Sequence, residues 1–400
     1  MTAEILIMNP SAISMATDSV VTVGDKKTYS GVNKLFMLSN NHPMGIMIYG
    51  NANFMEMPME SLIKEYRKIC ETKEYKTVKE FADNFMIFLK DYSFSKSDPK
   101  EIFEKYLNDF KDKMPNDFIN ELINDTDDIL NKLNSQFDKK FLNFLKSKEY
   151  GEYDHFFDKI IGDNPNVYSK QKIKIKEILQ KYFIVFLLLQ STGIVISGFN
   201  EEDIYPSFSA NNILTIVKDE LWFDEIFKKE NYKYPIIQPF AQTDVVNTFL
   251  MGVDMNILNS IGHFFKNGIN DYTNMIFEII EKNKKLTKKE LNNLKNEIII
   301  FNENNNRLLE EYEALIKNLV NSSNNPISNS INALPKEELG NMAESLIHIT
   351  SLKRKFEEEL ETVGGDIDVA IISKGDGFIW AKRKHYFDPG LNYQFFNRKN

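Results

Sequence analysis

The sequence predicts an α+β protein whose helices pack on both sides of β-sheet, with two all-α insertions. Two observations indicate this fold class. Short, β-branched, strand-like segments alternate with amphipathic helices in the order strands, two helices, strands, two helices, strands. Two long stretches rich in Lys, Asn and Glu interrupt this order, and because they share no period we interpret them as insertions rather than repeats.

Length, charge and cysteine content limit the function classes. The 400 residues exceed one ordinary domain, and a hydrophobic fraction of 42% is enough for a sizeable core. The net charge of −9 argues against nucleic acid as a partner. Cys70 is the single cysteine, and the polar residues 190–192 interrupt the most apolar run. The start of the sequence has no basic region and carries Glu4, so we expect no signal peptide there. We therefore expect a cytoplasmic protein without a membrane span.

The first part of the core covers residues 1–93 and begins with strands. Apolar segments bounded by Asn, Pro, Gly and Ser predict strands at 3–8, 12–23 and 44–50. The turns between and beside them fall at 9–11, 24–27 and 39–43. Helical spacing then predicts helices at 58–70 and 77–92, and Thr77 with Glu80 resembles a capping box at the start of the second.

The first insertion covers residues 94–181, where heptad-like apolar spacing and scarce glycine predict helices. The second part of the core covers 182–267. It opens at 182–199 with the end of a buried helix that runs into a buried strand. Further strands are predicted at 207–217 and 234–242, followed by a helix at 243–257.

The second insertion covers residues 268–332, and its heptads predict an antiparallel helical hairpin. A cluster of Ser, Asn and Pro at 322–330 predicts a loop. The third part of the core covers 333–400. It is predicted to hold a helix at 336–361 and a final hairpin of strands at 367–375 and 377–384.

Thr2, Asp18 and Lys34 follow one another at equal steps along the predicted strands. A hairpin centred on Pro10 places Thr2 opposite Asp18, and a hairpin centred between residues 25 and 27 places Asp18 opposite Lys34. Both centres coincide with predicted turns. Facing Cβ atoms lie about 4.5–5.5 Å apart, so the spacing predicts that the three polar groups line up across one sheet.

These residue types suit nucleophilic catalysis by an N-terminal threonine. Removal of Met1, which a small second residue permits, gives Thr2 a free α-amine with a reference pKa of about 7.7–8.0. That amine can take the proton of the Thr2 hydroxyl. Lys34 supplies a positive charge that lowers the pKa values of the amine and the hydroxyl, and Asp18 keeps Lys34 charged and oriented. The N–H of Gly50 can stabilise an oxyanion. The alternative interpretation is a surface ion pair beside an ordinary threonine.

At these positions the chain resembles the proteasome β-subunit family, which are peptidases of the N-terminal nucleophile (Ntn) hydrolase class. The similar pieces are Thr2, "MATDS" with Asp18, "GVNKLF" with Lys34 and "YGNANF" with Gly50. Thr22 matches the family's substrate-aligning strand residue. The resemblance implies a four-layer αββα sandwich, a threonine peptidase acting on peptide or protein substrates, and no cofactor or metal.

The chain also departs from the family pattern around the expected α-amine. The family places a serine at the start of its central helix, where Thr243 is the nearest residue here. It also places an aspartate–serine pair before the final double glycine, where this chain has Leu360 and Val363. The five histidines have no metal-ligand spacing, in agreement with an enzyme that needs no metal.

Two other functions stay open at this point. Ntn hydrolases also cleave small amides, and a proteasome-like scaffold without catalysis would use its insertions to bind a partner. For the peptidase itself, the insertions are predicted to form a lid or to dock a regulatory partner. They would also cover or replace the surfaces through which the family stacks, so we expect a homo-oligomer other than the usual double ring, if one forms.

Overall fold

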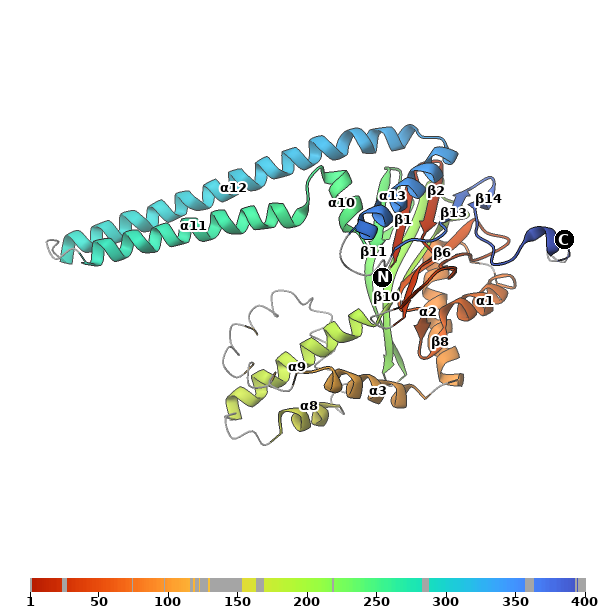
Figure 1. Cartoon of the computed structure of the whole chain (residues 1–400), viewed down its shortest axis with the longest axis horizontal. Helices are drawn as coiled ribbons and strands as arrows, with labels where there is room; N and C mark the ends of the chain where they lie inside the picture. Colours follow the sequence, from red (N-terminus) through yellow and green to blue (C-terminus); the bar gives the residue numbers. More distant parts are fainter. Residues whose placement is uncertain are drawn as a thin grey trace.

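The computed structural model consists of two β-sheets, helices packed on them and a long helical hairpin (Figure 1). The structure describes residues 2–23, 27–73, 75–96, 98–115, 153–162, 169–217, 219–282, 288–356 and 363–392, with the isolated positions 118, 122, 129 and 394. Most of the predicted helices at 116–152, and the end of the predicted helix at 357–361, lie outside the described residues.

The first sheet has five antiparallel strands in the order β12-β1-β2-β13-β14. β1 is an interior strand and completely buried, because its side chains face other elements on both sides. The strands are β1 (Ala3–Asn9), β2 (Ala12–Thr17), β12 (Ile236–Ala241), β13 (Asp368–Ser373) and β14 (Gly377–Lys382).

The second sheet also has five antiparallel strands, in the order β11-β10-β9-β6-β5. Its strands are β5 (Leu35–Met37), β6 (Met44–Gly50), β9 (Thr192–Phe199), β10 (Pro206–Val217) and β11 (Glu220–Lys229). Two small two-stranded pairs complete the β-structure: β3 (Val21–Val23) with β4 (Lys27–Tyr29), and β7 (Asn53–Phe54) with β8 (Met57–Pro58).

The two sheets pack against each other through an apolar cluster that takes Leu6, Met8 and Met15 from the first sheet and Met47 and Val195 from the second. Alternate side chains of β1 point the other way, where they pack on α13 (Lys336–Phe356). The outer face of the second sheet packs on α1 (Met59–Cys70) and α2 (Val78–Lys96). Helices therefore pack on both sheets, and the two sheets pack on each other.

The first helical segment packs on β10 through an aromatic cluster that includes Phe103, Phe157, Phe183 and Trp222. Its helices are α3 (Pro99–Asp112), α8 (Asp154–Ile161) and α9 (Ser169–Leu189). The predicted boundaries at 93 and 181 fall inside α2 and α9, because the apolar pattern that predicts each helix continues across them.

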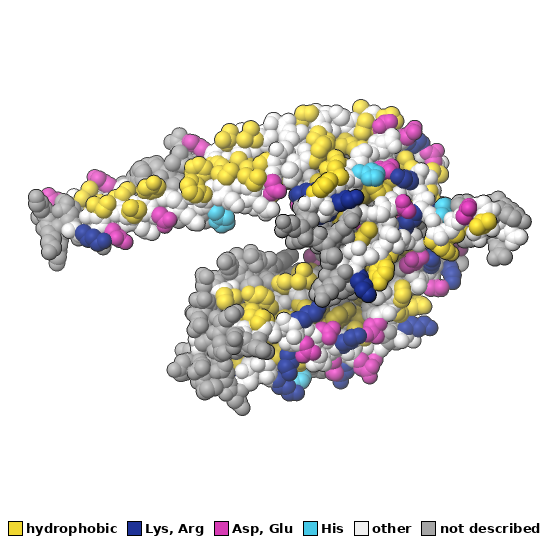
Figure 2. Space-filling view, in the orientation of Figure 1, with side chains coloured by type: hydrophobic (Ala, Val, Ile, Leu, Met, Phe, Trp, Pro, Cys, Tyr) yellow, Lys and Arg dark blue, Asp and Glu magenta, His cyan; other side chains and the backbone are white. Residues whose placement is uncertain are grey.

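The second helical segment forms the antiparallel hairpin that the heptads predicted, and we call it the arm (Figure 1). It consists of α11 (Met255–Lys282) and α12 (Lys288–Ala333), and the short α10 (Asp244–Met251) leads into it. The predicted boundary at 267 falls inside α11. Figure 2 shows yellow apolar side chains along its surface. The exposed large apolar side chains of the arm include Phe264, Met275, Leu315 and Leu319.

Several elements differ from the sequence prediction, among them the predicted strand at 12–23, which is two strands, β2 and β3, in separate sheets. The predicted loop at 322–330 is helical and includes Pro326, because Ile327 and Ile331 pack against the first sheet and hold the chain in place. The predicted helix at 243–257 is two helices, which separate after Gly252. β11 was not predicted, since its sequence "ELWFDEIFKK" alternates weakly and carries several charges.

No helix in the described part of the chain is both long enough and apolar enough to span a membrane.

Cys70 is buried at the end of α1, and burial raises the pKa of its thiol to about 12. A thiol with this pKa is almost entirely protonated at neutral pH, so Cys70 is a packing residue rather than a nucleophile.

Candidate active site

Thr2, Asp18 and Lys34 lie in contact with one another. Lys34 Nζ donates to Thr2 Oγ1 at 2.5 Å and to Asp18 Oδ1 at 2.7 Å. Its third acceptor is the carbonyl oxygen of Val20, also at 2.5 Å. A lysine ammonium carries three N–H donors, so these three acceptors use every donor that Lys34 has.

The Asp18 carboxylate, which follows β2, accepts hydrogen bonds on both oxygens. Oδ1 accepts from the N–H of Ala3 at 3.1 Å as well as from Lys34. Oδ2 accepts from the N–H groups of Val20 and Gly364, each at 3.2 Å. Segments that are far apart in the sequence therefore fix the position of Asp18, and Asp18 in turn fixes the position of Lys34.

The register that brings these groups together is not the predicted one. In the first hairpin Glu4 pairs with Thr17, one residue away from the predicted pairing, so Ala3 and not Thr2 lies opposite Asp18. The cause is the turn: Asn9 Oδ1 accepts from the N–H groups of Ser11 and Ala12, which moves the centre of the hairpin beyond Pro10.

The second predicted hairpin is also different. Thr22 pairs with Thr28 in the small β3–β4 ribbon, whereas the predicted hairpin would pair Thr22 with Ser30. If the observed pairing continued along the chain, Asp18 would not face Lys34. Lys34 directly precedes β5 of the second sheet, whereas Asp18 follows β2 of the first. The three polar groups therefore meet between the two sheets rather than across one sheet.

All three side chains are withdrawn from solvent. The exposed fractions are 5% for Thr2, 4% for Lys34 and 0% for Asp18. Burying a lysine and an aspartate costs several kcal/mol in desolvation, and good hydrogen-bond geometry is needed to offset it. The cluster therefore combines a hydroxyl with a rigid, water-excluded pair of opposite charges, a setting in which a fixed positive charge acts strongly on a neighbouring oxygen.

Gly50 and Thr22, the other two predicted site residues, lie on chain segments next to Lys34. The N–H of Ile48 donates to the carbonyl oxygen of Lys34 at 2.9 Å, and Gly50 follows two residues later at the end of β6. Gly50 has a φ of +76°, and a Cβ there would lie 2.5 Å from the carbonyl oxygen of Ser191. Only glycine suits this backbone position. Thr22 is half-buried and follows Val20, which accepts a hydrogen bond from Lys34.

Comparison of the sequence with protein-family models gives no match, and comparison with curated proteins gives none either. Within the described residues, no cluster of three or more His, Cys, Asp and Glu side chains is arranged to hold a metal ion.

Glu4 is a polar residue of this region that the sequence prediction missed. Its side chain is 0% exposed, and no described residue donates a hydrogen bond to either carboxyl oxygen. Burial raises the pKa of this carboxyl well above its ordinary value of 4.5, with the charge of Asp18 adding to the rise and that of Lys34 opposing it. The available signal was a single acidic residue within the apolar strand "AEILIMN".

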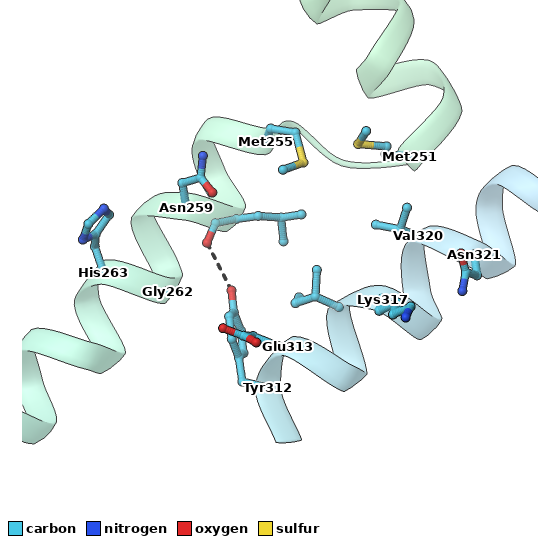
Figure 3. Close-up of a pocket in the computed structure, with 12 residues that line it drawn as sticks. Met251, Met255, Asn259, Gly262, His263, Tyr312, Glu313, Lys317, Val320 and Asn321 are labelled. Atoms are coloured by element: carbon cyan, nitrogen blue, oxygen red, sulfur yellow. Dashed lines mark hydrogen bonds between the residues drawn. The ribbon is translucent and has the colours of Figure 1, made fainter. Parts of the chain in front are cut away.

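Two cavities differ in their relation to this site. One cavity of about 420 Å³ is lined by Tyr49, Phe240 and Ala241. Phe240 and Ala241 belong to β12, which pairs with β1. A second, of about 640 Å³, lies at the base of the arm and shares no lining residue with the site (Figure 3). There the hydroxyl of Tyr312 donates to the carbonyl oxygen of Leu258 across the hairpin. Of these two cavities, the smaller adjoins the strand that Thr2 precedes.

Proposed function

We propose that the protein is an N-terminal threonine hydrolase of the proteasome β-subunit type, which cleaves amide bonds through an acyl-enzyme on Thr2. The observation that carries the proposal is the buried contact of Lys34 Nζ with both Thr2 Oγ1 and Asp18 Oδ1. A hydroxyl, a lysine and a carboxylate in mutual contact form the arrangement that an activated nucleophile requires.

The proposed mechanism assigns the role of general base to the α-amine of Thr2, exposed by removal of Met1. Lys34 cannot take this role while its three donors are used, and it acts as a fixed positive charge. Thr2 Oγ1 forms a bond to the substrate carbonyl carbon as its proton moves to the α-amine, and the amide C–N bond breaks as that proton passes to the leaving amine. Water then hydrolyses the ester. Gly50 N–H would hold the oxyanion and Thr22 would align the substrate.

The packing of the sheets supports the finer fold assignment, a four-layer αββα sandwich of the Ntn-hydrolase kind. The apolar cluster between the sheets, the α13 layer on the first sheet and the α1–α2 layer on the second follow this order. Thr2 directly precedes β1 at the edge of the space between the sheets.

Peptides or proteins are the first candidate substrates, and small amides are the second. The cavity of about 420 Å³ beside Phe240 and Ala241 favours the second candidate, because its volume falls in the range of small-molecule sites. The exposed apolar side chains of the arm support a regulatory partner or self-association in either case.

A β-lactone probe tests the proposal directly. Opening of the lactone by Thr2 Oγ1 gives an ester whose added mass is located by peptide mass spectrometry, and intact mass reports whether the chain begins at Thr2. We expect the adduct in the wild-type protein and in Thr72→Ala, a surface threonine control. We expect its loss in Thr2→Ala and in Lys34→Ala. An adduct that persists in Thr2→Ala would place the nucleophile elsewhere, and hydrolysis assays with peptide and small-amide libraries separate the two substrate classes.

A further inference from the structure

The Glu4 carboxyl lies in the space between the sheets, on the same side of the strand as Thr2. Side chains alternate along a strand, and Leu6 and Met8 both belong to the apolar cluster between the sheets. Glu4 therefore points into this space, and Thr2, two residues before it, is directed to the same face. On the neighbouring strands its partners in register are Thr17 and Phe240.

The charged and titratable groups around Glu4 already have partners of their own. Asp368 on β13 lies opposite Thr17 of β2, and its carboxylate accepts hydrogen bonds from the backbone N–H and the Nζ of Lys384. Tyr49, on β6 of the facing sheet, donates its hydroxyl proton to Asn212 at 3.1 Å, and its pKa is raised mainly by burial, then by the charges of Glu4 and Asp224.

Lys34 is the cation that acts on Glu4, but it directs its three donors to Thr2, Asp18 and Val20. Thr17 also has a buried hydroxyl to which no described residue is hydrogen-bonded. A carboxyl buried completely beside a nucleophile, with no donor from the described residues, is costly unless a further donor reaches it.

We propose that Glu4 is a positioning residue for the α-amine of Thr2, and that its carboxylate receives the ammonium that forms there once Met1 is removed. This inference rests on the proposed function, because it needs a chain that begins at Thr2. Residues i and i+2 of a strand lie about 6.5 Å apart, and a glutamate side chain leaning back along the strand spans most of that distance.

The buried charges balance in this arrangement. Asp18 and Lys34 form one pair, and Glu4 with the α-ammonium forms a second. During acylation the α-amine gains the proton of Thr2 Oγ1, and the Glu4 carboxylate stabilises the resulting positive charge and directs the amine toward the hydroxyl. A carboxylate near an amine raises the pKa of the ammonium, so Glu4 also sets the pH above which the amine can act as a base.

The test measures the α-amine itself. Chains that begin at Thr2 are released from an N-terminal fusion, and competitive acetylation of the α-amine is followed across pH by mass spectrometry of the N-terminal peptide. In Glu4→Gln we expect the midpoint to fall by about one pH unit or more relative to wild type. Glu313→Gln, an exposed carboxylate on the arm, is the matched control and leaves the midpoint unchanged. Glu4→Asp, which keeps the charge on a shorter side chain, gives an intermediate midpoint and replaces Glu4→Gln if that variant does not fold.

A second readout separates this inference from the proposed function. The rate of β-lactone addition should rise with pH in wild type and show the same downward shift of its midpoint in Glu4→Gln. If no probe reacts at any pH while the acetylation midpoint still shifts, the hydrolase proposal fails and the role of Glu4 at the amine stands. If the probe reacts but both midpoints are the same in Glu4→Gln and wild type, the role of Glu4 is refuted and the hydrolase proposal stands.

Discussion

The space between the sheets and the surface of the arm depart from ordinary protein composition in opposite directions. Between the sheets, Glu4, Asp18 and Lys34 are ionisable side chains with at most 4% exposure. Along the arm, Phe264 and Leu319 are apolar side chains with 74% and 55% exposure, and Figure 2 shows how such side chains follow the hairpin. The molecule thus buries ionisable side chains between its sheets and exposes apolar side chains on its arm.

The difference shows that unusual residues affect the free energy of folding differently in the two regions. A buried ion pair costs desolvation energy that good geometry offsets only in part, so its presence points to a role other than stability. An exposed apolar side chain costs folding little, but it favours association with another surface. The core is therefore expected to respond strongly to single substitutions, and the arm weakly.

The largest effect is expected when Lys34 is replaced by methionine. The change leaves Asp18 as an unpaired buried charge, which costs about 3–5 kcal/mol of unfolding free energy. The measurement is urea denaturation. Lys64→Met removes an exposed helical ion pair with Glu60, and a loss of about 0.5 kcal/mol or less is expected there. Similar losses of unfolding free energy in Lys34→Met and Lys64→Met would contradict the expected difference between the buried and the exposed ion pair.

A matched pair of leucines compares the same truncation in both regions. Leu6 is 0% exposed between the sheets, and Leu6→Ala is expected to cost about 2–5 kcal/mol because it leaves a cavity. Leu319→Ala on the arm should change stability by about 0.5 kcal/mol or less. Chemical denaturation of both variants checks this, and a loss above about 1 kcal/mol for Leu319→Ala would mean that another surface covers the arm in solution.

The pH dependence of stability isolates Glu4. Its pKa in the folded chain is raised above 4.5, so the folded state holds this proton more tightly than the unfolded state does. Stability is therefore full below about pH 4.5 and falls as pH rises toward the folded-state pKa, by about 1.4 kcal/mol per pH unit. In chains that keep Met1, Glu4→Gln should remove this fall above about pH 4.5, as measured by denaturation at each pH.

The same experiment on chains that begin at Thr2 sharpens the comparison. There the proposed α-ammonium neutralises the Glu4 carboxylate, so the fall in stability should be smaller than in chains that keep Met1. Equal slopes with and without Met1 would contradict the pairing, whereas an absent slope in both would mean that Glu4 is already ionised and solvated.

The smallest effects are expected from two glycines with opposite outcomes. Gly50→Ala forces a Cβ to within 2.5 Å of the Ser191 carbonyl oxygen at a φ of +76°, which should cost about 1–3 kcal/mol. Gly268 lies inside α11, and a Cβ added there would meet no described atom within 4 Å, so Gly268→Ala should stabilise the helix by about 0.5–1 kcal/mol. Thermal denaturation distinguishes the signs, and destabilisation by both changes would contradict the assignment for Gly268.

Most strands could be predicted because their signal is local. β1, β6 and β9 are short apolar runs bounded by turn residues, and they form where the pattern indicates. The register could not be predicted as well, because it depends on the hydrogen bonds that Asn9 makes within the turn. Pro326 was misleading for a related reason, since the contacts that keep α12 helical come from residues distant in sequence.

The candidate site shows the same division. The grouping of Thr2, Asp18 and Lys34 could be predicted from their spacing even though the pairing used for that prediction was wrong, because the long side chain of Lys34 reaches both other groups from the second sheet. Glu4 could not be predicted as part of the site. Its burial depends on the second sheet, whose position over β1 is a property of the whole fold and not of the surrounding sequence.

The arm also has a mechanical consequence. α12 contains 46 residues, so it is a rigid lever about 69 Å long, and a tilt of about 5° at its base moves its far end by about 6 Å. The fulcrum is bonded to the first strand, since the side chain of Asn9 donates to the carbonyl oxygens of Ile331 and Leu334 at 3.0 and 2.9 Å. A load at the far end is therefore transmitted to β1, the strand that Thr2 precedes.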